Sequence, residues 1–489
     1  MVNREDELRI ASYSPTESPR SPEGLHETVI REQFEILRNT VNLDTGLWPA
    51  VEPGVGKKEA YEADHMGDAW IRDTSMNLIG LIETAALLKR LHPEGTSLGA
   101  DIRDFVRIDI ERLLSFLAKD PNRWFEKFRQ GVLVNEKYSC LIDPKYGGPG
   151  APEVHLKANG DPCPWERQNQ PDSWGELLIA LGRAKATGII QEYSKDELDQ
   201  EGRVTKVGQI TRIKQIAGYL CRIQPWNFEC SGMWEDPEVR APTSRSTALI
   251  IIKGLKAVRD IVKGDEIQAD IHVALRRTMK FVKEDPYTDK TSPDHGDGAD
   301  LAMAIAEAMP STDRTRMPAD KYISDNAERL SIGVSPAGKR HLYDRYFENP
   351  KVAIGEARWF ISNPTLVIDY AQATRLAMEE GEITRVYEPV AEHFKKSVTR
   401  FNQTIAVLNH YKYAPELFIP TDPECVSADD LPWIERDPNE NVLLVPLQRS
   451  LLWNRAFIAW AAAENLYTRQ RVEDLTSRID FPPGFFELN

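Results

Sequence analysis

Two acidic residues stand where a carboxyl group could do chemistry. Glu235 lies in the stretch MWEDPE between Trp234 and Asp236, and a bulky apolar neighbour with a like charge favours the protonated form that a general acid needs. Glu416, in YAPELFIPTDPE, interrupts an apolar segment, where a carboxylate costs free energy unless it has a partner or a task. An acid and a second carboxyl group are what hydrolysis of a glycosidic bond requires.

The second carboxyl group is not fixed by chemistry alone. Four acids in a wetter stretch compete with Glu416, namely Glu424, Asp429, Asp430 and Glu435. The alternative for Glu235 is an ordinary surface residue in a turn, since WED is a weak motif in isolation.

The tryptophans of the chain are unevenly distributed. Of the 11 tryptophans, eight lie in or beside polar stretches that precede apolar helical patterns: Trp70, Trp165, Trp174, Trp226, Trp234, Trp359, Trp433 and Trp453. Planar rings beside Asp, Glu, Arg, Gln and Asn suit a neutral sugar, which offers C–H faces and hydroxyl edges. The competing interpretation is tryptophans that close the ends of a large core. Eight together favour a neutral oligosaccharide or polysaccharide as the partner.

Charge and motifs exclude several other functions. The formal net charge of −15, with 61 basic against 76 acidic residues, argues against nucleic-acid binding. No HExxH or phosphate-binding loop is present, so we predict no metal and no cofactor. The stretch Asp294–Asp300, DHGDGAD, could hold a hard cation, but it lacks EF-hand spacing and is better interpreted as a helix-capping loop.

Compartment is predicted from the cysteines and the first residues. Five scattered cysteines without a CxxC pair predict free thiols in a reducing compartment. Residues 1–23 form a polar, Pro/Ser-rich stretch without a secretory apolar core, predicted to be flexible. No apolar run reaches the roughly 18 residues of a membrane span. We therefore predict a cytoplasmic protein without membrane contact, and find no signal of oligomeric state.

Helical periodicity dominates the rest of the chain, and it is of two kinds. Helices with one wet face are predicted at 26–41, 102–117, 204–223, 268–283 and 383–407, with a poorly defined one near 319–330. Helices that are apolar nearly all round are predicted at 72–91, 173–186, 244–259, 298–309, 363–380 and 450–466. Their alternation predicts an all-α toroid, an inner ring inside an outer ring, formed by residues 24–489 as one domain. Loops before the inner helices should then converge at one end.

From about Gly24 to Leu466 the chain resembles glycoside hydrolase family 15, the glucoamylase family, and especially the related domain of phosphorylase kinase alpha and beta regulatory subunits. NLDTGLWPAV and AWIRDTSMNL are similar to the family's TGLLPAS and W-x-R-D elements, and QPD to its Q-x-D element. MWED resembles its W-E segment, PELFIPTDPE its E-x-x-x-P, LLVPLQRSLLWNRA its P-L-x-W-x-x-A, and GKRHLYDRY its R-x-x-x-D-x-Y.

The resemblance implies an (α/α)6 fold of six helical hairpins and a set of site residues. It makes Glu235 the general acid and Glu416 the general base. The substrate contacts that it implies are Trp70, Arg72, Asp73, Trp165, Arg167, Gln170, Asp172, Trp234, Asp236, Arg340 and Trp453. Three departures stand out: Asp236 replaces a Glu or Arg of relatives, Asn454, which follows Trp453, replaces a Ser or Gly, and Trp165 precedes Gln170 by five residues instead of four.

Three hypotheses follow. The first is an inverting, exo-acting glycoside hydrolase that releases glucose from the non-reducing end of α-glucosides such as malto-oligosaccharides. The second is a weakly active or non-catalytic glucan-binding regulatory module. The third is an enzyme that cleaves trehalose.

Overall fold

The computed structural model describes the following residues: 22–53, 69–119, 145–146, 170–224, 229–230, 241–242, 245–263, 267–284, 305–306, 308–310, 336–337, 357–359, 362–380, 387–411, 413–414, 417–421, 435–436, 443–446 and 451–477.

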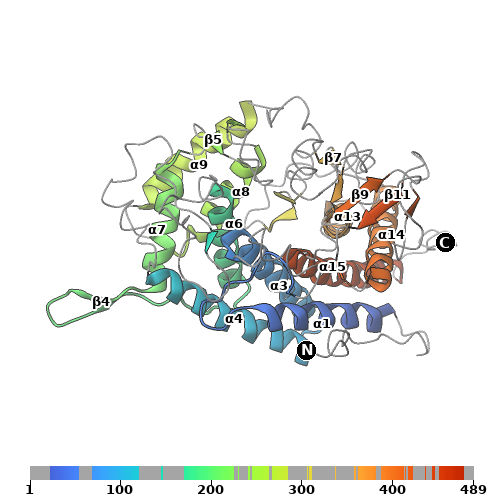
Figure 1. Cartoon of the computed structure of the whole chain (residues 1–489), viewed down its shortest axis with the longest axis horizontal. Helices are drawn as coiled ribbons and strands as arrows, with labels where there is room; N and C mark the ends of the chain where they lie inside the picture. The colour runs from blue at the N-terminus through green and yellow to red at the C-terminus, as the bar shows by residue number, and fades with distance from the viewer. Residues whose placement is uncertain are drawn as a thin grey trace, which may run out of the picture.

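The inner helices form an uninterrupted run of neighbours. They are α3 (Ile71–Leu91), α6 (Pro171–Ala186), α8 (Arg245–Val258), α13 (Ser362–Glu380) and α15 (Leu452–Thr476). Packing runs in the order α13, α15, α3, α6, α8 (Figure 1). The Lys253 ammonium group then donates from α8 to the carbonyl oxygens of Ala306, at 2.7 Å, and Met309, at 2.6 Å. This contact continues the run to the buried residues of the predicted fourth inner helix.

Helices with one solvent-exposed face surround this run. They are α1 (Pro22–Thr40), α4 (Ser97–Ala118), α7 (Gln209–Arg222), α9 (Ile267–Glu284) and α14 (Tyr387–Tyr411). Helix α1 packs on α15, α4 on α3, α7 on α6, α9 on α8 and α14 on α13. The all-α class and the inner and outer rings are confirmed. The poorly defined outer helix near 319–330 lies outside the described residues.

One predicted helix starts too early. Val204–Lys206 is strand β4, which pairs antiparallel with β3 (Glu197–Leu198), and α7 begins only at Gln209. Leu198 faces Val204 across this hairpin, and both side chains are exposed. Figure 1 shows the hairpin projecting away from the helices. The β-branched residues Val204 and Thr205 suit a strand.

Glycines let α6 approach its neighbour α8. A Cβ on Gly254 would lie 2.4 Å from the carbonyl oxygen of Gly175, and a Cβ on Gly182 would lie 2.5 Å from that of Ala257. Helix α3 uses the same device, since a Cβ on Gly80 would lie 2.7 Å from the carbonyl oxygen of Ala456 in α15. The α6–α8 and α3–α15 contacts therefore bring backbone against backbone at these positions.

Short strands gather the segments that precede the inner helices. A five-stranded antiparallel sheet has the order β10 (Glu435–Arg436), β11 (Leu443–Pro446), β9 (Leu417–Thr421), β8 (Ala357–Trp359), β7 (Pro336–Ala337). Strand β8 precedes α13 and β11 precedes α15, so the sheet joins the segments that lead into these two inner helices. Two further pairs are β1 (Ala69–Trp70) with β2 (Lys145–Tyr146) and β5 (Glu229–Cys230) with β6 (Ala241–Pro242).

The described residues contain neither a membrane-spanning helix nor a metal-binding cluster. None of their helices has the length and apolar character needed to cross a membrane. No group of three or more His, Cys, Asp or Glu side chains among them could hold a metal ion. Cys221 is a buried free thiol, and burial raises its pKa to about 12.

Candidate functional site

The first turns of α3 and α6 bring two predicted substrate contacts together. Arg72 lies at the start of α3 and Asp172 at the start of α6, and both side chains are buried. The Nε and Nη2 atoms of Arg72 both lie 3.2 Å from Oδ2 of Asp172. The carboxylate sits in the first turn of its helix, where the helix dipole stabilises negative charge. This ion pair fixes the relative position of two helix starts that are 100 residues apart in sequence.

Two further predicted contacts flank this ion pair. Asp73 follows Arg72 in the first turn of α3 and is also buried. Gln170 is the residue that precedes α6, where its Oε1 atom lies 3.5 Å from the hydroxyl group of Ser173. Hydrogen-bond donors and acceptors therefore lie around the starts of two inner helices, supplied by Arg72, Asp73, Gln170 and Asp172.

The third helix start, that of α15, is joined to α3 by the stretch around Ala50. Pro49 bridges to Ala69, Val51 bridges to Leu451, and the Leu452 amide donates to the carbonyl oxygen of Ala50 at 3.1 Å. Ala69 immediately precedes Trp70, and Leu451 lies two residues before Trp453. The stretch LWPAV of the sequence thus holds two predicted aromatic contacts near the same end of the ring.

Both of these tryptophans are nearly buried in the structure. Trp70 is 7% exposed and Trp453 is 5% exposed, with its ring edge-on to that of Phe457. The indole N–H of Trp453 has no hydrogen-bond partner within the described part of the chain. Trp174, which could have been either a pocket wall or a packing residue, is completely buried inside α6, as a packing residue is.

Glu176 was missed by the sequence reasoning. It lies one helical turn after Asp172 and is completely buried. Burial raises the pKa of its carboxyl group well above the usual range, Asp172 raises it further, Arg72 opposes the shift and Asp73 adds to it. The signal was a single acid inside WGELLIALG, an otherwise apolar run.

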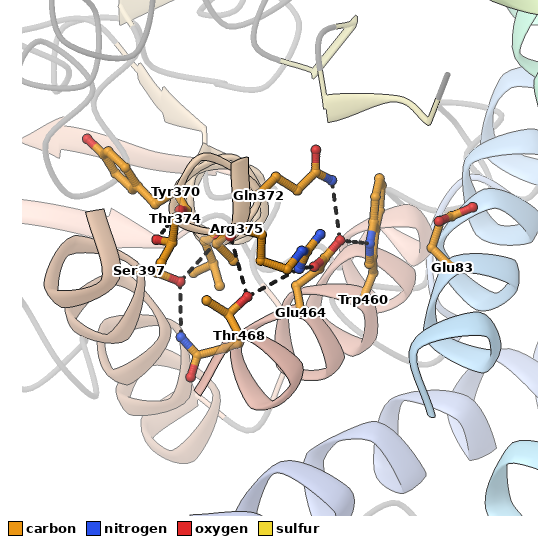
Figure 2. Close-up of polar contacts among 12 residues, drawn as sticks. Glu83, Tyr370, Gln372, Thr374, Arg375, Ser397, Trp460, Glu464 and Thr468 are labelled. Atoms are coloured by element: carbon orange, nitrogen blue, oxygen red, sulfur yellow. Dashed lines mark hydrogen bonds and ion pairs between the residues drawn. The ribbon is translucent and has the colours of Figure 1, made fainter. Parts of the chain in front are cut away.

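A second charged layer crosses the interior farther along the same helices. Glu83 of α3 binds Arg183 of α6 through two bonds of 2.6 and 2.9 Å. Glu464 of α15 accepts from Arg375 of α13, and also from Gln372 at 3.3 Å and the Trp460 indole at 3.2 Å (Figure 2). Glu83 is ten residues beyond Asp73, so this layer lies about 15 Å deeper along α3.

This deeper charged layer links α3 and α6 to α13 and α15. Burial by itself lowers the pKa of Arg183, but Glu83, and then Glu464, raise it above its usual value. Glu464 therefore acts on a cation from α6 while it binds one from α13. Both carboxylates of the layer are paired with guanidinium groups, and we assign the layer to holding the helices together.

Several predicted residues lie outside the described part of the chain. These are both proposed catalytic residues, Glu235 and Glu416, and the contacts Trp165, Arg167, Trp234, Asp236 and Arg340; the Asp294–Asp300 stretch is outside as well. Strands β5 and β6 flank the segment that contains Glu235, and β9 begins one residue after Glu416. The assignments of these residues stay predictions.

The chain is similar in structure to a glucoamylase. No protein-family model and no curated protein sequence matches it. Among solved structures, the glucoamylase from Saccharomycopsis fibuligera superposes with a TM-score of 0.52 at 12% sequence identity, over 92% of this chain and 96% of that one. The likeness shows the fold, an (α/α)6 toroid of six helical hairpins.

Proposed function

We propose that this protein is an inverting glycoside hydrolase that releases glucose from the non-reducing end of α-glucosides, with Glu235 as general acid and Glu416 as general base. The observation that carries the proposal is the buried Arg72–Asp172 ion pair beside Asp73, at the starts of two inner helices. A fixed guanidinium group next to carboxylates offers donors and acceptors at set positions, as neighbouring sugar hydroxyls require. The fold shared with a glucoamylase agrees with this choice.

The proposed reaction needs no group beyond two carboxyls and water. Glu235 gives its proton to the glycosidic oxygen as the bond between that oxygen and the anomeric carbon breaks. Glu416 takes a proton from a water molecule whose oxygen bonds to the anomeric carbon from the opposite face. The anomeric configuration inverts, so an α-glucoside yields β-glucose, and the two carboxyl groups would lie about 6.5–9.5 Å apart.

The experiment compares wild type, Glu235→Gln and Glu416→Gln on maltose, maltotriose, isomaltose, nigerose and trehalose. We expect β-glucose in proton NMR spectra of a fresh wild-type digest, and a loss of at least about 100-fold in kcat for each variant. Glu473→Gln, an exposed position on α15, is the matched control and should keep full activity.

Other outcomes would lead elsewhere. Fresh α-glucose would rule out inversion, and activity that survives both substitutions would rule out the site. Calorimetric binding of malto-oligosaccharides without sugar release would instead support the glucan-binding regulatory module. Release from trehalose alone would support the third hypothesis.

A further inference from the structure

Glu176 is an acid whose position in the fold needs an explanation. It lies on α6 one turn beyond Asp172, with no exposed surface, and neither carboxyl oxygen has a hydrogen-bond partner among the described residues. A buried polar group without a partner costs free energy. The mechanism above does not use it.

Charged groups of both signs act on Glu176. Arg72 of α3 favours the ionised form of Glu176, whereas the acids Asp172 and Asp73 oppose it. Among the other helices packed on α6, Arg212 of α7 donates to the carbonyl oxygen of Ala118, and Lys253 of α8 donates to those of Ala306 and Met309. Where α8 touches Gly175, its residues are Ile250 and Ile251.

The outcome of this competition is visible in the geometry. Asp172 holds Arg72 by two contacts of 3.2 Å, while Glu176 makes no hydrogen bond. An uncharged Glu176 leaves the guanidinium group to Asp172. An ionised Glu176 would attract the same guanidinium group and repel Asp172 from one turn away.

We propose that Glu176 is a positioning residue that governs the Arg72–Asp172 ion pair and thereby sets the alkaline limit of sugar binding. Glu176 acts through that pair, from one helical turn farther along α6. This inference rests on the proposed function. Because the pair binds hydroxyl groups and takes no part in proton transfer, ionisation of Glu176 changes KM and leaves kcat unaltered.

The test follows KM and kcat for maltose from pH 5 to 9.5 in wild type and Glu176→Gln. Gln has the shape of Glu but stays uncharged, so both proteins should have the same KM at pH 5. Toward pH 9.5 the wild-type KM should rise by about tenfold, the change expected for a coupling of one pKa unit, while that of Glu176→Gln stays flat. The kcat profiles should coincide.

Asp109→Asn is the matched control. Asp109 is another completely buried acid whose pKa is raised by burial, but it lies on the outer helix α4. Its substitution should leave the wild-type rise of KM in place. Superimposable KM profiles for wild type and Glu176→Gln would overturn the proposal, and so would a flat profile in Asp109→Asn.

A measurement without sugar separates this proposal from the proposed function. Unfolding of wild type, Glu176→Gln, Asp172→Asn and the double variant should show non-additive effects at pH 9, with the unfolding constant departing at least about twofold from the product of the single effects. At pH 5 the unfolding constant of the double variant should equal the product of the two single effects. If no sugar is cleaved or bound but the coupling appears, the proposed function fails and the governing role of Glu176 stands; additivity at both pH values overturns that role.

Discussion

Asp109 shows at the scale of one residue what an unpartnered carboxyl group does to stability. It is completely buried in α4, and neither oxygen has a hydrogen-bond partner among the described residues. Burial raises the pKa of Asp109 well above 3.8, and Arg112 only partly offsets the shift. The folded protein therefore binds this proton at pH values where the unfolded chain has released it.

The sign of the pH effect follows from this difference. From pH about 3.8 up to the raised pKa, the folded state binds more protons, so the free energy of unfolding falls as pH rises. Asp109→Asn removes this slope, because an amide does not titrate. We expect the stability of the variant relative to wild type to increase from pH 4 to pH 8, measured by denaturant unfolding. Parallel pH profiles of the two proteins would contradict this explanation.

Sequence reasoning reached some site residues and missed others for a physical reason. Arg72 and Asp172 were predicted because AWIRDTSMNL and QPD resemble family elements, and the structure joins the two side chains. Glu176, Glu83 and Glu464 are single charges inside helices that look apolar all round, so their helices were predicted but their chemistry was not. Their importance depends on groups from other helices, such as Arg183, which lies 100 residues from Glu83. No local pattern contains that information.

At the scale of elements, the long helices were predictable and the short strands were not. A helix such as α3 repeats its apolar character over 21 residues, whereas the longest described strand, β9, has five. Strands of two residues show no alternation that a sequence could reveal. The sequence therefore does not predict the five-stranded sheet, which joins the segments that lead into α13 and α15. For the same reason the sequence pattern predicts helix from Val204, where the structure has strand β4.

The contact between α6 and α8 gives the prediction at this scale. Gly254→Ala would place a methyl group 2.4 Å from the carbonyl oxygen of Gly175, a backbone atom that cannot move alone. We expect the helices to be forced apart at a cost of about 1–3 kcal/mol in the free energy of unfolding, measured by urea denaturation.

Gly218→Ala is the matched control for this contact. Its new methyl group would meet only the flexible end of Ile267, at 3.1 Å. Since alanine is the better helix former, this change in α7 should be neutral or stabilise by up to about 1 kcal/mol. Equal effects of the two substitutions would show that the close approach of α6 and α8 is not limiting.

At the scale of the whole molecule, the two ends of the described chain close the ring. Helix α1 packs on α15, and the imidazole of His26 hydrogen-bonds the amide oxygen of Asn465 at 3.0 Å. Arg455 binds Glu52 through contacts of 3.1 and 2.9 Å and Gln33 through one of 3.0 Å. A ring closed by its last helix should unfold as one unit, because losing this joint exposes the buried faces of both neighbours.

Arg455→Met tests that closure. The substitution removes one partner of a largely buried ion pair and leaves the charge of Glu52, which should lower the free energy of unfolding by about 3–5 kcal/mol. If the ring unfolds as one unit, tryptophan fluorescence and circular dichroism should still give a single coincident transition with an unchanged denaturant slope. Arg107→Met is the control, since its ion pair with Glu111 is solvent-exposed and should contribute less than about 1 kcal/mol. Two separate transitions in Arg455→Met would mean that the halves of the ring fold independently and that the deeper charged layer, not the closure, sets its stability.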